Sequence, residues 1–157
     1  MTMTRSDIWL IVDVSGSMAE GQKLLQARGV IREVEQMIRF GYLQPGRIRL
    51  SSVSSSGVKE IPWDVDEEYP QCLLSAEGCF AGSALAEFVR GSDDRIVIVT
   101  DGFWRTSVIN EVKEAVAGKK PGRVRIIKLG SSAAYLHGDC VFNAEALWEA
   151  LDGWKTK

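Results

Sequence analysis

Two short motifs carry side chains that could bind a metal ion. The first places Asp13, Ser15 and Ser17 at alternate positions of an Asp-Val-Ser-Gly-Ser sequence, and the second places Asp101 in a Thr-Asp-Gly sequence. Carboxylate and hydroxyl groups offer only oxygen atoms, the ligands that hard cations such as Mg2+ and Mn2+ prefer. The alternative for the first motif alone is a polar turn in which Ser17 caps the following helix.

Each motif follows an apolar run that is typical of a buried strand. Residues 7–12 and 95–100 are nearly continuous apolar runs, with a length that suits strands covered on both faces. In open α/β sheets, functional groups gather at the carboxyl ends of strands, where the strand order reverses. If the two strands are neighbours at that point, Asp13 and Asp101 come within reach of one shared ion.

Helices and further strands surround these two runs. Apolar residues recur at steps of three and four from Leu24 to Ile38, which predicts a helix that ends near Gly41. Residues 47–53 and 58–62 predict an antiparallel pair of strands at a sheet edge, because their connection is too short for a crossover. Residues 63–78 have weak periodicity and predict a loop with at most one helical turn.

The second half of the chain continues the alternation. We expect helices at residues 84–91 and 108–116, strands at residues 124–129 and 140–142, and a last helix that carries Leu147 and Leu151. Ser107 and Asn143 are the predicted N-caps of the last two helices. The fold class is therefore α/β: a doubly wound, mostly parallel sheet with helices on both faces and one antiparallel edge strand. The whole chain, residues 1–157, is expected to form one domain.

Composition narrows the range of functions. The chain has 157 residues and a formal net charge of -2, so it carries no overall charge that would favour nucleic acid or a membrane surface. The apolar stretch at residues 8–12 is shorter than a signal-peptide core, and no window approaches the ~20 apolar residues of a membrane span. We expect a cytoplasmic protein that binds neither nucleic acid nor membrane.

Together the motifs resemble the metal-ion-dependent adhesion site of the von Willebrand factor type A family. The resemblance covers nearly the whole chain, because the order and length of the elements also match that Rossmann-like fold. It assigns Asp13, Ser15 and Ser17 to the first loop and Asp101 to the third loop. The second-loop ligand, a threonine in most members, falls on Ser83. Serine keeps the hydroxyl group but lacks the β-branch that restricts threonine.

The resemblance also implies a mode of action. Five oxygen ligands leave a coordination position open, and an Asp or Glu of a protein partner completes the shell of the metal ion. We therefore expect a non-enzymatic, metal-dependent protein-binding module of a bacterial cell, loaded with Mg2+ or Mn2+ in preference to Ca2+. Small intracellular relatives accompany AAA-type ATPases or components of kinase and phosphatase systems, and the resemblance implies a partner of this kind.

Three residues next to the third loop extend this prediction. Phe103, Trp104 and Arg105 directly follow the Thr-Asp-Gly sequence, and tryptophan and arginine are enriched among binding hot spots. We interpret them as a partner-binding patch beside the metal ion. The alternative is that Phe103 and Trp104 pack beneath the loop as part of the core.

Two enzyme classes compete with this interpretation. A phosphatase of the haloacid dehalogenase type would use Asp13 as its nucleophile, but it needs a second aspartate where this chain has Ser15. A serine hydrolase would need His137 as its base, and the chain has no Gly-x-Ser-x-Gly sequence. A third possibility is a scaffolding domain that binds its partners away from the metal.

The cysteines predict reduced, structural thiols. Cys72, Cys79 and Cys140 are odd in number and form no Cys-x-x-Cys pair. A zinc site that joins them to His137 is the alternative, although the spacing of Cys72 and Cys79 is wide for a zinc knuckle.

Overall fold

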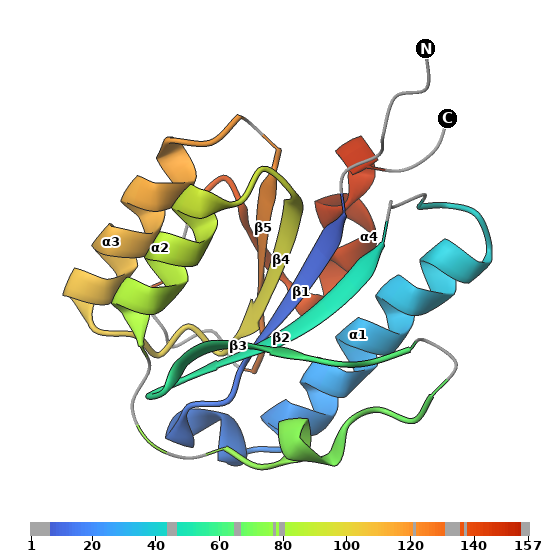
Figure 1. Cartoon of the computed structure of the whole chain (residues 1–157), viewed down its shortest axis with the longest axis horizontal. Coiled ribbons are helices and arrows are strands. Elements are labelled where there is room, and N and C mark those ends of the chain that lie inside the picture. The colour runs from blue at the N-terminus through green and yellow to red at the C-terminus, as the bar shows by residue number, and fades with distance from the viewer. Residues whose placement is uncertain are drawn as a thin grey trace.

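The fold is built on a parallel sheet that ends in one antiparallel strand. A computed structural model describes residues 7–43, 47–64, 67–76, 78, 81–120, 122–130, 136 and 138–154. Within these residues six strands form one sheet in the order β3-β2-β1-β4-β5-β6 (Figure 1). Their bounds are β1 (Ile8–Asp13), β2 (Ile48–Ser54), β3 (Gly57–Ile61), β4 (Arg95–Thr100), β5 (Val124–Lys128) and β6 (Val141–Asn143). Only β3 pairs antiparallel, with β2, as the short connection predicts.

Helices cover both faces of this sheet (Figure 1). The α-helices are α1 (Lys23–Arg39), α2 (Gly82–Gly91), α3 (Thr106–Ala117) and α4 (Leu147–Ala150). Short 3-10 helices are η1 (Gly16–Ala19), η2 (Gln71–Leu74), η3 (Ala144–Ala146) and η4 (Asp152–Trp154). α1 and α4 lie on one face, and α2 and α3 lie on the other. None of the helices that the structure describes is long and apolar enough to cross a membrane.

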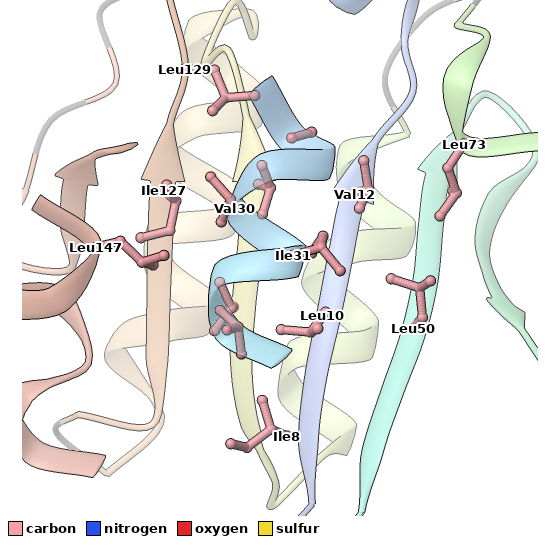
Figure 2. Packing of buried hydrophobic residues seen from close by; sticks show 14 of the residues in the cluster. Ile8, Leu10, Val12, Val30, Ile31, Leu50, Leu73, Ile127, Leu129 and Leu147 are labelled. Carbon is pink, nitrogen blue, oxygen red and sulfur yellow. The ribbon is translucent and has the colours of Figure 1, made fainter. Parts of the chain in front are cut away.

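The central strand β1 shows why its sequence is apolar throughout. Ile8, Leu10 and Val12 pack in the cluster that contains the buried face of α1 (Figure 2). The alternate residues Trp9 and Ile11 pack in the second cluster, with α2 and α3. Successive side chains of a strand point to opposite faces, so a strand covered on both sides needs apolar residues at every position.

The sheet order confirms that the two predicted motif-bearing strands are neighbours. β1 pairs with β4 in parallel, with Val12 opposite Val99. The chain adds β2 on one side of β1 and later crosses over to add β4 on the other, so the strand order reverses between β1 and β4. Asp13 and Asp101 therefore lie side by side at the carboxyl ends of the strands. Ligands of α/β sheets usually bind at this point.

The first and last described elements contact the opposite end of the sheet, where the parallel strands begin. The backbone N–H of Ile8 donates to the carbonyl of Arg47, just before β2 begins. The indole N–H of Trp154 donates to the carbonyl of Gly122, just before β5 begins. Both flanks of the chain thus meet the sheet at the amino ends of its strands.

Two predicted helix caps are wrong. α3 begins at Thr106, two residues earlier than an N-cap at Ser107 predicts, because the backbone N–H of Ile109 already donates to the carbonyl of Arg105 (3.0 Å). Ser107 therefore lies inside the first turn. Asn143 precedes a 3-10 turn, and its side chain makes no capping hydrogen bond.

Candidate metal centre

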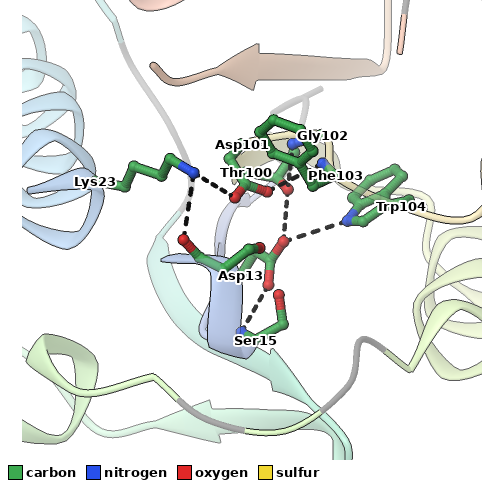
Figure 3. A network of polar contacts seen from close by, with 9 residues as sticks. Asp13, Ser15, Lys23, Thr100, Asp101, Gly102, Phe103 and Trp104 are labelled. Carbon is green, nitrogen blue, oxygen red and sulfur yellow. Dashed lines mark hydrogen bonds and ion pairs between the residues drawn. The ribbon is translucent and has the colours of Figure 1, made fainter. Parts of the chain in front are cut away.

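Asp13 is the last residue of β1 and is held by hydrogen bonds to both of its carboxylate oxygens. Its side chain is buried, and the backbone N–H of Ser15 donates to Oδ1 (2.8 Å). The hydroxyl of Thr100 and the indole N–H of Trp104 donate to Oδ2 (2.6 and 3.2 Å; Figure 3). These three donors fix the orientation of the carboxylate at the edge of the sheet.

Burial raises the pKa of Asp13 above its ordinary value, because the charged form loses its contact with water. Hydrogen bonds from Ser15, Thr100 and Trp104 oppose this rise by stabilising the charged form. A buried carboxylate is costly unless a positive charge lies near it. A positive charge placed near Asp13 would stabilise its charged form.

Asp101 is the second buried carboxylate, and it follows β4 directly. Its Oδ1 accepts the backbone N–H of Phe103 (3.1 Å), and its Oδ2 accepts the ammonium group of Lys23 (3.0 Å). Gly102 makes this turn possible, since its φ of +75° is a conformation that side chains disfavour. We call Asp13 and Asp101 the acidic pair.

Lys23 joins the two loops that carry the acidic pair. It is the first residue of α1, and its ammonium group also donates to the carbonyl of Ser17 (3.3 Å). The ring of Phe103 lies under the same group, 4.8 Å from Nζ to the ring centroid. The motifs do not reveal this role of Lys23. One signal in the sequence could have revealed it: a lysine at the start of the predicted helix. A cation in the first turn of a helix is unfavourable next to the helix dipole, so a compensating negative charge is expected nearby.

Ser15 and Ser17 lie beside the acidic pair, as the first motif predicts. Ser15 is buried and half-buried Ser17 follows it, and both border a hollow of ≈490 Å3. Gly78, residues 103–105, Ser107 and Val108 form other parts of its wall. We call this feature the rim hollow, and it has room for a side chain from another molecule.

Ser83 does not join this group. It is exposed in the first turn of α2, and its hydroxyl donates to Glu111 on α3 (3.4 Å). The reason is local packing: a Cβ added to Gly82 would lie 2.6 Å from Cγ1 of Val108, so α2 begins in close contact with α3. The segment before α2 reaches the first loop at Gly78 instead, whose carbonyl accepts the backbone N–H of Gly16 (2.9 Å).

The predicted partner-binding patch divides into two parts. Phe103 is 50% exposed and Arg105 is also exposed, so both can contact another protein. Trp104 is only 6% exposed, and its indole N–H is committed to Asp13. The prediction of Trp104 as an exposed contact is therefore corrected: it packs beneath the loop, as the core alternative describes, and supports the acidic pair.

The oxygen atoms of the side chains at these strand ends suit a hard divalent cation. Asp13 and Asp101 carry two negative charges, and Lys23 supplies one positive charge. A divalent cation would balance the acidic pair completely, and the side chains of Asp13, Ser15, Ser17 and Asp101 offer only oxygen ligands. Among the described residues, no three His, Cys, Asp or Glu side chains gather into a metal-binding group. Any site here would thus combine two carboxylates with hydroxyl groups and water.

The alternative zinc site cannot be followed in full. Cys79 and His137 lie outside the described residues. Cys72 is exposed in η2, and Cys140 is half-buried just before β6. Leu73 of η2 packs in the cluster on the α1 face of the sheet, and Cys140 packs in the cluster on the other face. The sheet therefore separates η2, which carries Cys72, from Cys140.

Comparison with solved structures identifies the fold. A von Willebrand factor type A protein from Catenulispora acidiphila matches 98% of this chain with 17% identity and a TM-score of 0.51. The proximal thread matrix protein 1 of the mussel byssus, with a zinc-occupied adhesion motif, matches 94% with 12% identity and a TM-score of 0.54. Manganese-loaded TRAP protein of Plasmodium vivax matches 98% with 13% identity and a TM-score of 0.56.

These proteins are mostly longer than the chain. The match covers 38% of the Catenulispora protein, 45% of the mussel protein and 75% of TRAP. It covers 30% of the pilus adhesin SpaC from Lactobacillus rhamnosus GG, which has a TM-score of 0.59 and 14% identity. No family model and no curated protein matches the sequence. The structural matches alone establish that the chain has the fold of von Willebrand factor type A domains.

Proposed function

We propose that this von Willebrand factor type A fold serves as a metal-dependent protein-binding module. Asp13, Ser15, Ser17 and Asp101 hold a divalent cation, and an Asp or Glu of a partner protein completes its coordination. The observation that carries this proposal is the acidic pair itself: two buried carboxylates, from neighbouring strand ends, beside the rim hollow.

The proposed ion is Mg2+ or Mn2+. Both take oxygen ligands and are usually bound by one or two carboxylates with several waters, which suits the acidic pair. The mussel protein and TRAP support a divalent metal in this fold, because their structures hold zinc and manganese. Ser83 stays the second-loop ligand that the resemblance implies, and in the structure its hydroxyl donates to Glu111.

The proposed partner is a protein with an exposed acidic side chain. Phe103 and Arg105 are exposed beside the rim hollow, so an apolar contact and a charge can accompany the carboxylate. The resemblance of the motifs extends the proposal to an AAA-type ATPase, or a kinase or phosphatase system, in a bacterial cytoplasm. A scaffolding role away from the metal is the second candidate, and substitution of Phe103 distinguishes the two.

Phosphatase chemistry fits the site less well than binding does. The general acid that this chemistry requires would stand at Ser15, whose hydroxyl cannot serve as one near neutral pH.

Direct titration with Mn2+ tests the proposal. The wild-type chain should bind one Mn2+ in isothermal titration calorimetry, and Asp13→Asn or Asp101→Asn should weaken binding by about 100-fold or more. Glu60→Gln is the matched control, because Glu60 also forms an ion pair, with Arg49, but at the sheet edge. Binding that is absent in the wild type, or equal in all variants, would refute the metal site.

A second step tests the partner. The wild-type chain is used to capture proteins from a bacterial lysate in Mg2+ and in chelator, with Asp101→Asn in parallel. A protein that is retained only by the wild type in Mg2+ supports docking through the metal. Equal retention in all three conditions would assign the partner to another face.

A further inference from the structure

We propose that Lys23 is a built-in counter-ion of the metal centre. Its ammonium group and a divalent cation are alternative charges for Asp101, so Lys23 sets how tightly the site binds metal. This inference rests on the proposed metal-binding function and adds a residue that the two motifs do not contain.

The position of the ammonium group is the first observation. Nζ of Lys23 lies 3.0 Å from Oδ2 of Asp101, whose side chain is fully buried, and the side chain of Lys23 is itself only 13% exposed. The same nitrogen reaches the carbonyl of Ser17 (3.3 Å), in the loop that carries the other proposed ligands. A single positive charge therefore lies between the first and third loops, where the proposed cation must also bind.

The backbone before α1 is the second observation. Gln22 has a φ of +61°, and it is the only non-glycine residue in the described part of the chain with a positive φ. A left-handed conformation at such a residue costs free energy and persists where the surroundings demand it. Gly21 before it has the same φ, so two left-handed residues in succession bring Lys23 to the start of α1.

The helix itself gives no reason for a lysine at this place. The amino end of a helix carries a partial positive charge, which disfavours a cation in the first turn. α1 has no acidic residue in its first turn to offset the charge of Lys23. The carboxylate that offsets it comes from the end of β4, which makes Asp101 the reason for the placement.

Two further neighbours fit the side chain of Lys23 closely. The ring of Phe103 lies 4.8 Å from Nζ, and Cε lies 3.4 Å from where a Cβ on Gly130 would stand. Gly130 has a φ of +77°, so this position already favours glycine. The contact with half-exposed Phe103 also gives the long side chain a path to the surface.

The two cations compete for the same oxygen. Nζ of Lys23 already occupies Oδ2 of Asp101, and two cations that share this oxygen repel each other at short range. Asp13, Asp101 and Lys23 sum to a net charge of -1, so a divalent cation added to all three leaves +1 in a buried place until a partner carboxylate binds. In the absence of a partner, metal binding therefore favours departure of Lys23 from Asp101.

The test compares Mn2+ affinity in variants of Lys23. Lys23→Met keeps most of the length and removes the charge, and it should lower the Kd for Mn2+ by about tenfold or more, as the loss of a competing buried cation implies. Lys23→Arg keeps the charge and should not bind more tightly than the wild type. The matched control is Lys119→Met, because the ammonium group of Lys119 likewise donates to two acceptors, both of them carbonyls, but lies near the amino ends of the strands.

A stability measurement supplies a second readout. Without metal, Lys23→Met leaves Asp101 with no positive partner, so its Tm in chelator should fall below that of the wild type, and Mn2+ should raise it by a larger increment. If Lys23→Met does not fold, Lys23→Gln takes its place, because the amide can still donate a hydrogen bond to Asp101. The Kd of Lys23→Gln for Mn2+ should likewise be lower than that of the wild type.

The outcomes separate this inference from the proposed function. Equal Mn2+ affinity in Lys23→Met and the wild type, or weaker affinity in the variant, overturns the counter-ion role and leaves the metal site intact. Absence of Mn2+ binding in both proteins overturns the two proposals together. Tighter binding in Lys23→Met alone, with Lys119→Met unchanged, supports both.

Discussion

The ammonium group of Lys23 and the carboxylate of Asp101 lie 3.0 Å apart, although 78 positions separate the two residues in the sequence. The contact joins the start of α1 to the end of β4, across the edge where the strand order reverses. It thus ties together the two loops that carry the acidic pair.

Asp101→Ala should destabilise the protein in chelator. The variant leaves the ammonium group of Lys23 largely buried without its partner and beside a helix amino end, which is expected to cost about 3 kcal/mol. Urea unfolding followed by circular dichroism measures the change. Asp101→Asn should lose less, because its amide oxygen still accepts a hydrogen bond. Equal stability of the alanine variant and the wild type would show that the pair contributes nothing.

Trp104→Phe should weaken the support of Asp13 without changing the shape of the core greatly. The indole N–H donates to a buried carboxylate, and the loss of such a bond costs about 1.5 to 3 kcal/mol. Unfolding in chelator measures this cost. Trp148→Phe is the control, since Trp148 is 43% exposed and the same change there should stay within about 0.5 kcal/mol. A cost at Trp148 as large as that at Trp104 would contradict the assignment.

Phe103→Ala should reduce partner retention and leave stability nearly unchanged. Phe103 is exposed beside the rim hollow, and loss of an aromatic contact in an interface costs at least about tenfold in affinity when it is a hot spot. Phe40→Ala is a matched control: Phe40 is also exposed, also lies under a cation, Arg39, and stands at the other end of α1. Retention that depends on Phe40 and not on Phe103 would favour the scaffolding alternative.

Cys140 should react slowly with alkylating reagents at pH 8. Burial raises the pKa of its thiol above the ordinary value, so less of the reactive thiolate is present at that pH. Exposed Cys72 should react about tenfold faster than Cys140. A timed reaction with iodoacetamide, followed by mass spectrometry of peptides, measures both rates. Raising the pH to about 10 should speed the reaction of Cys140, because more of its thiol is then ionised. Equal rates at pH 8 would show that the burial of Cys140 has no such effect.

The sequence predicts most of the fold because the decisive signals are local. The continuous apolar run that became β1 requires cover on both faces, and the short turn between β2 and β3 permits only antiparallel pairing. The location of Asp13 and Asp101 follows from these elements, since both residues end strands of one parallel sheet. Helix caps are less predictable: α3 starts at Thr106 because of a backbone bond to Arg105, which no side-chain pattern encodes.

The side chains around the acidic pair depend on tertiary packing, and the motifs do not specify them. Ser83 follows a glycine that lets α2 pack closely on α3, and its hydroxyl therefore meets Glu111. Trp104 is of a residue type that is enriched in binding hot spots, but it lies under its loop and donates a hydrogen bond to Asp13. Lys23 gains its role only because α1 begins beside the end of β4. Each case combines segments that are distant in sequence.

The arrangement of the two flanks determines how the molecule can be tethered. Ile8 and Trp154 both lie near the amino ends of the strands, while Asp13 and Asp101 stand at the carboxyl ends. A bead, sensor surface or fused protein attached through either flank would therefore hold the molecule with the acidic pair directed away from the attachment.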